Sequence, residues 1–177
     1  MKIVLIGYRA SGKSTLGQLL SQQLDMPYLD VDRRIEEDID GQTLTDYWRQ
    51  IGDAAFREHE ARVVQELCAC DHAVIAFGAG TLKFPTSRQM AQRNALVVYL
   101  QVPIPELWRR FQSDPRTAST RPNLAGGGIE EIEQLLAERE PVYLECASLV
   151  IDGTRPPQEL AAEVAAAFTT ICGTPQR

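Results

Sequence analysis

The segment GYRASGKS, residues 7–14, constrains the fold more than any other part of the chain. It fits the pattern G-x-x-x-x-G-K-[ST], in which glycines let the backbone turn tightly so that successive amide groups surround phosphate oxygens. The apolar run KIVLI precedes it, and leucines at helical spacing follow it from Leu16 to Leu24. A strand, a phosphate loop and a helix in this order predict an α/β fold that binds a nucleotide at the start of the helix.

The loop also assigns roles to its own residues. Lys13 is expected to reach the β- and γ-phosphates, and the Ser14 hydroxyl to ligate Mg²⁺. The residues expected to contact ATP are Gly7, Ala10, Ser11, Gly12, Lys13, Ser14 and Thr15. Two alternatives stay open at this point: a glycine turn with an exposed lysine, and a phosphate loop in a regulatory protein without catalysis.

Four further apolar runs predict the rest of the sheet. Segments with helical spacing separate them, and this alternation is typical of parallel strands joined by helical crossovers. The expected strands are residues 2–6, 27–32, 73–77, 95–100 and 148–152. The expected helices are one from the loop to Leu24, then 33–39, 44–51, 54–70, 86–94, 105–112, 129–140 and 157–171. Gly52 is expected to break the helical pattern, with Asp53 as an N-cap.

Composition and charge exclude several classes of protein. The 177 residues are 44% hydrophobic and 24% charged, as in ordinary globular proteins, and the formal net charge of -6 disfavours binding to nucleic acid. KIVLI is too short for a signal peptide or a membrane span, so we expect a cytoplasmic protein without a membrane partner. The four cysteines and two histidines lack the spacing of a zinc site. No linker is visible, so one domain is expected over residues 1–172, with a frayed tail at 173–177.

Two aspartates follow the second apolar run. At a spacing of two residues in a strand, Asp30 and Asp32 would point to the same face, at the carboxyl end of the sheet. There, one carboxylate can support the hydration shell of Mg²⁺ while the other accepts a hydrogen bond from a substrate hydroxyl. The alternative is that both are turn residues that cap a helix starting at Arg33.

Two arginines suggest the chemistry of the acceptor. Arg57 lies in FREHE and Arg139 in EREPVY, and each has acidic neighbours. If they converge beside the segment GAG, residues 78–80, they form a site for a carboxylate, which guanidinium groups bind in bidentate fashion. The alternative for Arg57 is an ion pair with Glu58 or Glu60 without a binding role.

The segment DPRTASTRPNLAGGG, residues 114–128, has no apolar periodicity. Loops of this length are uncommon in compact domains unless they are functional, so we expect a mobile lid. A lid that closes over both substrates would exclude water from phosphoryl transfer.

Taken in order, these motifs resemble those of the shikimate kinase family over essentially the whole chain. The matching segments are GYRASGKST, LDVD, FREHE, GAG, TRP at 120–122 and REPVY. The resemblance implies a P-loop fold like that of nucleoside monophosphate kinases, with three layers, a five-stranded parallel sheet and a lid. It also implies transfer of the γ-phosphate of ATP to the 3-hydroxyl of shikimate, by a protein expected to be a monomer.

The resemblance further implies individual roles. Asp32 would bind the shikimate hydroxyls and take the proton, and Asp30 would hold Mg²⁺ through water. Arg57 and Arg139 would clamp the carboxylate beside Gly78, Ala79 and Gly80. Lys13, Asp32 and Arg121 are therefore the expected catalytic residues. Arg121 would close from the lid onto the phosphates, and Arg110 would stack on adenine. The substrate-binding helices would span residues 33–70.

Two features depart from the family pattern. Ala79 stands where family members usually have a glycine, which implies either a negative φ at that position or a reshaped pocket. The lid segment also looks longer than usual, which leaves Arg116 without an assigned role. The alternatives that stay open are another small-molecule kinase, such as a gluconate or nucleoside monophosphate kinase, and a noncatalytic nucleotide-binding protein.

Overall fold

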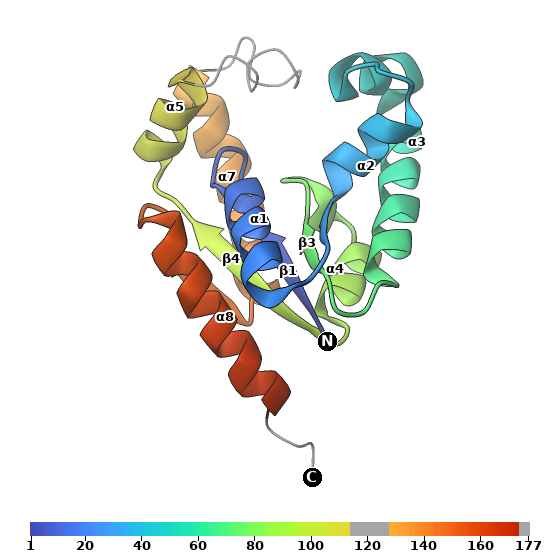
Figure 1. Cartoon of the computed structure of the whole chain (residues 1–177). Coiled ribbons are helices and arrows are strands. Elements are labelled where there is room, and N and C mark those ends of the chain that lie inside the picture. Colours follow the sequence, from blue (N-terminus) through green and yellow to red (C-terminus); the bar gives the residue numbers. More distant parts are fainter. Residues whose placement is uncertain (114–127, 174–177) are drawn as a thin grey trace.

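The protein is built on a parallel sheet of five strands (Figure 1). A computed structural model describes residues 1–113 and 128–173. The strands are β1 (Lys2–Ile6), β2 (Tyr28–Asp30), β3 (Val74–Ala76), β4 (Ala95–Gln101) and β5 (Leu149–Asp152). They lie in the order β2-β3-β1-β4-β5. The predicted number of strands and their parallel pairing are thus confirmed.

Helices connect the strands, as parallel pairing requires. Their bounds are α1 (Lys13–Leu24), α2 (Val31–Asp38), α3 (Leu44–Cys68), α4 (Pro85–Gln92), α5 (Ile104–Ser113), α7 (Gly128–Cys146) and α8 (Pro157–Gly173). A short 3-10 turn, η1 (Thr81–Lys83), follows β3. Each predicted helix is present, and its bounds lie within about two residues of those expected except at the end of α7.

The central strand shows how the sequence produces three layers. Side chains alternate between the two faces of a strand, and in β1 all five residues are buried. Ile3 and Leu5 pack into an apolar cluster with residues of α1 and α8, whereas Val4 and Ile6 pack into a second cluster with residues of α2, α3, α4 and α7. Helices therefore cover both faces of the sheet, as Figure 1 shows.

Two predicted boundaries were wrong. The strand expected at 27–32 ends at Asp30, and α2 begins at Val31, because the Asp30 carboxylate accepts hydrogen bonds from the amides of Asp32 and Arg33 and so caps the helix. Asp32 consequently lies in the first turn of α2 and not in the strand. The helix expected at 129–140 continues to Cys146, past Pro141, since Tyr143 in this extension is buried against the core.

Helix α3 has a break at the glycine that the sequence marks. Gly52 adopts φ 79° and ψ 165°, a conformation that residues with a side chain rarely take, and the helix changes direction there. The segment 44–51 and the segment 53–68 are thus two helical parts of one element. Trp48 Nε1 donates a hydrogen bond to Asp53 Oδ1 across the break, at 3.1 Å.

Most of the expected lid, with Arg116 and Arg121, and the tail from residue 174 lie outside the described residues. Within the part of the chain that is described, no helix is long and apolar enough to cross a membrane.

Candidate active site

The loop after β1 has the geometry of a phosphate cradle. Gly7 has φ 144° and Gly12 has φ 101°, and a Cβ on Gly7 would lie only 2.9 Å from the carbonyl oxygen of Leu100. Ala10 also has a positive φ, 59°. These turns bring the loop around to Gly12, which directly precedes the first helical residue of α1. The helix N-terminus therefore faces the space that the loop encloses, and its dipole favours an anion there.

Lys13 lies over this loop. Its Nζ donates hydrogen bonds to the carbonyl oxygens of Gly7, at 2.9 Å, and of Tyr8, at 2.8 Å. These two hydrogen bonds hold the ammonium group beside the space that the loop encloses. Among the loop residues of the predicted ATP site, Ala10, Ser11, Gly12, Lys13, Ser14 and Thr15 line the cavity there.

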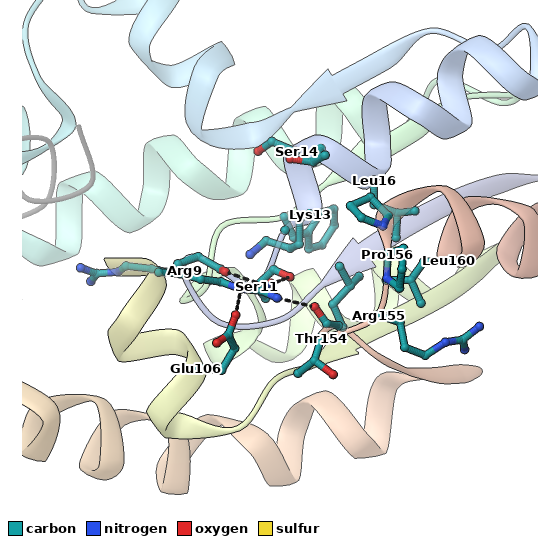
Figure 2. A pocket seen from close by; sticks show the side chains of 18 of the residues that line it. Arg9, Ser11, Lys13, Ser14, Leu16, Glu106, Thr154, Arg155, Pro156 and Leu160 are labelled. Carbon is teal, nitrogen blue, oxygen red and sulfur yellow. Dashed lines mark hydrogen bonds and ion pairs between the residues drawn. The ribbon is translucent and has the colours of Figure 1, made fainter. Parts of the chain in front are cut away.

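The cavity around the loop has a volume of about 760 Å³. This is within the range of pockets that enclose small-molecule ligands. Figure 2 shows Lys13 on one side of it, with Glu106 from α5 and with Thr154 and Arg155 from the segment after β5 on other sides. Elements far apart in the sequence thus close the cavity around the phosphate loop.

Arg110 lines the same cavity but is bonded mainly to backbone. Its guanidinium donates to Glu106 Oε1 at 2.7 Å, to the carbonyl of Ser11 at 3.2 Å and to that of Gly153 at 2.8 Å. Hydrogen bonds from Arg109 and Arg110 lower the pKa of Glu106 to about 2. Arg110 therefore ties the loop to the segment after β5. The expected stacking on adenine stays a prediction.

Ser14 and Asp30 come together at the start of α1. Ser14 Oγ lies 3.4 Å from Asp30 Oδ2, which also accepts a hydrogen bond from the Tyr28 hydroxyl at 2.7 Å. Burial, and then the neighbouring Asp30, raise the pKa of Tyr28, which therefore stays a neutral donor. Hydroxyl and carboxylate oxygens are the ligands that Mg²⁺ takes in proteins, so this pair fits the predicted role.

A second, smaller cavity adjoins the first, and Asp32 and Arg9 line both. Asp32 reaches this boundary from the first turn of α2 instead of from a strand. Its Oδ1 would lie 2.7 Å from a Cβ on Gly78, so only glycine fits at that position without displacement of the carboxylate. The boundary between the cavities is thus the place where groups bound in each would meet.

Arg57 faces the second cavity and is ion-paired at the same time. Its Nη1 donates to Glu60 Oε2 at 2.9 Å, and its Nε lies 3.4 Å from Asp53 Oδ1. Glu60 is only 3% exposed and accepts a second hydrogen bond, from Thr81 Oγ1, at 2.8 Å. Burial raises the pKa of Glu60, although Arg57 acts in the opposite direction. The ion-pair alternative for Arg57 is therefore correct as a contact, and the buried pair also fixes the guanidinium toward the cavity.

The GAG segment forms the floor of this cavity together with Arg139. Ala79 is 5% exposed and does not adopt a positive φ, so its methyl group fits without backbone strain. The Tyr143 hydroxyl donates to the carbonyl of Ala79 at 2.5 Å, and a Cβ on Gly80 would lie 3.3 Å from the Arg57 guanidinium. Of the two possibilities for Ala79, a φ that is not positive is thus the one observed.

Arg139 approaches the cavity from α7. Its guanidinium lies over the ring of Tyr8, 5.7 Å from the centroid, in a cation–π contact with a residue of the phosphate loop. Its neighbour Glu140 points elsewhere and accepts hydrogen bonds from Tyr99 and Gln101. The structure therefore brings Arg57 and Arg139 to one cavity, as predicted.

Several residues of the site were not predicted from the sequence. Arg9 lines both cavities, Trp48 and Phe56 line the second, and Tyr143 supports its floor. Arg9 lies inside the phosphate loop, where a charged residue in a variable position was a usable signal. The other three are apolar or aromatic residues on helical faces, and nothing in their spacing distinguishes them from core residues.

The fold and the two adjoining cavities define a small P-loop kinase, with a phosphate cradle in one cavity and a carboxylate at the boundary to the other. The family model for shikimate kinase matches residues 9–169. A curated shikimate kinase from Enterococcus faecalis is 38% identical over 163 residues, which cover 92% of this chain and 95% of the relative. This chain belongs to the shikimate kinase family.

Solved structures agree with this assignment. A shikimate kinase from Acinetobacter baumannii in complex with shikimate superposes with a TM-score of 0.87 at 28% identity, covering 99% of this chain and 95% of that one. A shikimate kinase from Bacteroides thetaiotaomicron has a TM-score of 0.83 at 27% identity, covering 98% of this chain and 99% of that one. The similarity therefore extends over the whole architecture.

Proposed function

We propose that this protein transfers the γ-phosphate of ATP to the 3-hydroxyl group of shikimate. The observation that carries the proposal is the contact between the two cavities: Asp32 lines both, with the phosphate cradle on one side and Arg57, Arg139 and the GAG segment on the other. An acceptor that carries a carboxylate and neighbouring hydroxyls matches this distribution of charge.

Proton transfer is assigned to Asp32. As the 3-hydroxyl oxygen forms its bond to the γ-phosphorus, the hydroxyl proton passes to the Asp32 carboxylate. The bond between the γ-phosphorus and the bridging oxygen breaks, and ADP leaves with that electron pair. Lys13 and the loop amides stabilise the negative charge on the transferred group.

The acceptor is oriented by charge on the opposite wall. Arg57 and Arg139 bind the shikimate carboxylate, so that the ring hydroxyls point toward Asp32. The buried contacts of Arg57 with Glu60 keep its guanidinium in place before the substrate arrives. Orientation of this kind raises the rate because the reacting atoms no longer have to find each other.

Mg²⁺ belongs to this proposal, with Ser14 as a direct ligand and Asp30 as a ligand through water; when bound, the ion supplies positive charge to the phosphates. Arg121 would add charge from the lid. Gly7, Ala10, Ser11, Gly12 and Thr15 would contact ATP together with Lys13 and Ser14. We also propose a single domain, and a monomeric protein of the cytoplasm.

The test is ADP release from Mg²⁺-ATP by the purified protein, with and without shikimate, and with the product identified by mass. We expect shikimate-dependent release of ADP and a shikimate phosphate ester. Asp32→Asn keeps the shape of the side chain but removes the proton acceptor, so it should lower kcat about 100-fold or more. Asp40→Asn, at an exposed position beyond α2, is the matched control and should behave like the wild type. Activity on another hydroxy acid and none on shikimate would contradict the proposal.

A further inference from the structure

A buried histidine joins the helical segments that form the wall of the acceptor cavity. His59, on the second part of α3, is only 7% exposed. Its Nε2 lies 3.0 Å from Asp38 Oδ2, at the end of α2, and its Nδ1 lies 2.9 Å from the hydroxyl of Tyr47, on the first part of α3. One imidazole ring thus bonds to two other segments and joins three, which are separated by Asp40–Gln42 and by the break at Gly52.

The hydrogen-bond directions in this network follow from its chemistry. A hydrogen bond and ion pair with Arg34, and then the hydrogen bond from His59, hold the pKa of Asp38 below its usual range, so the carboxylate can only accept. His59 Nε2 must then carry a hydrogen and donate. In the neutral ring Nδ1 is the acceptor, and the Tyr47 hydroxyl donates to it. Both ring nitrogens are therefore satisfied by partners on other segments.

The same three segments carry side chains of the acceptor cavity. Helix α2 supplies Asp32, residues 44–51 supply Leu44 and Trp48, and residues 53–68 supply Asp53, Phe56, Arg57 and Glu60. His59 itself does not line the cavity. Its ring packs at 5.6 Å from the Tyr47 ring, and Tyr47 in turn packs at 6.2 Å from the ring of Phe56, which lines the cavity.

We propose that His59 is a positioning residue for the acceptor: through Asp38 and Tyr47 it fixes α2 and both parts of α3 as one body, and so sets the distance between Asp32 and Arg57. The break at Gly52 gives such a tie a purpose, because φ and ψ there are not helical and the two parts of α3 are joined across it by the hydrogen bond from Trp48 to Asp53. The expected change in the KM for shikimate rests on the proposed function, whereas the joining of α2 and α3 by His59 does not.

The kinetic test compares variants that keep or remove the two bonds. His59→Leu removes both and should raise the KM for shikimate about 10-fold, while the KM for ATP changes less than about 2-fold. His59→Gln can still donate to Asp38 and should stay within about 3-fold of the wild type. Tyr47→Phe removes one hydroxyl only, and provides the same test if His59→Leu does not fold. His72→Asn is the matched control, since His72 is exposed and its φ of 61° suits asparagine.

Hydrogen exchange without substrates tests the tie separately from the reaction. In His59→Leu, amides of α2 and of residues 44–51 should exchange about 10-fold or more faster than in His72→Asn, with little change in β1 and β4. Unchanged exchange in these segments would overturn the inference, whether or not the wild type phosphorylates shikimate. Equal increases in both KM values, or equal effects of leucine and glutamine at position 59, would also overturn it. If the wild type does not use shikimate, the proposed function fails and exchange alone decides the role of His59.

Discussion

The nucleotide cavity and the acceptor cavity share a wall but are made in different ways. The phosphate cradle consists mostly of backbone: amides, carbonyls and two glycines with positive φ within eight consecutive residues. The acceptor cavity is lined mainly by charged and aromatic side chains from α2, α3 and α7, together with Arg9 and the segment Gly78–Gly80. The phosphate cradle is therefore encoded by one short stretch of sequence, whereas the acceptor cavity forms only after distant elements have packed.

The largest effect is expected from a substitution in the nucleotide cavity. Lys13→Ala removes the ammonium group whose Nζ lies over the loop, so transfer should fall by about 10³-fold or more, because the charge of the transferred phosphoryl group loses its fixed partner. Steady-state turnover with shikimate measures this effect, and circular dichroism checks the fold. Lys83→Ala, at an exposed position in η1, is the control. Turnover above one tenth of the wild-type rate in Lys13→Ala would contradict the role of the loop.

A change on the acceptor side should be selective instead of general. Arg57→Ala should lose about 2–4 kcal/mol of transition-state stabilisation toward shikimate, as expected for a charge-assisted clamp, while the KM for ATP stays nearly constant. Comparison of kcat/KM for the two substrates measures the difference. Arg49→Ala, on the same helix with its side chain 61% exposed, should change neither. Unchanged kinetics in Arg57→Ala would contradict the proposal that Arg57 binds the carboxylate of shikimate.

The floor of the acceptor cavity provides a finer comparison between neighbouring positions. A Cβ at position 78 would lie 2.7 Å from Asp32 Oδ1, so Gly78→Ala should displace the carboxylate and lower kcat about 10- to 100-fold. Ala79→Gly should change kcat by no more than about 3-fold, because Ala79 already has an unstrained φ. The kcat values of the two variants check this. A larger effect at 79 than at 78 would show that the methyl group of Ala79, and not the space at Gly78, adjusts the pocket.

The smallest effect concerns the tie between α5 and the loop. Glu106→Gln weakens the ion pair that holds Arg110, so the KM for ATP should rise about 2- to 5-fold, as expected for a partly exposed ion pair. The pKa of Glu106 in the folded protein is about 2, below its ordinary value of 4.5. Its ionised form therefore stabilises the fold above pH 4.5, and this contribution disappears as the pH falls toward 2.

Urea denaturation at several pH values measures this linkage. At pH 7 the midpoint of Glu106→Gln should lie below that of the wild type, and the two should converge near pH 2. Glu37→Gln, which removes an exposed pair with Arg33, serves as the control. A difference that stays constant down to pH 2 would show that the substitution acts on something other than the charge of Glu106.

The contrast between the cavities also explains what could be predicted from the sequence. The loop, the five strands and the break at Gly52 follow from local patterns, since glycine conformation and side-chain alternation act over a few residues. Asp32 was placed in a strand because the alternation continues to it, but the capping bonds of Asp30 start a helix first. The contacts of Tyr143 with Ala79 and of His59 with Asp38 join residues 64 and 21 positions apart, and no local pattern contains them.

The shared wall at Asp32 and Arg9 has a consequence for ligand design. Because the two cavities adjoin, one molecule that joins a nucleotide to a cyclic carboxylate through a short bridge would occupy both without crossing solvent. Its second half would bind at an effective concentration set by the bridge and not by dilution, so the linked compound should bind more tightly than either half alone. The bridge would have to pass both the Asp32 carboxylate and the Arg9 guanidinium, so its charge would have to match the two side chains together.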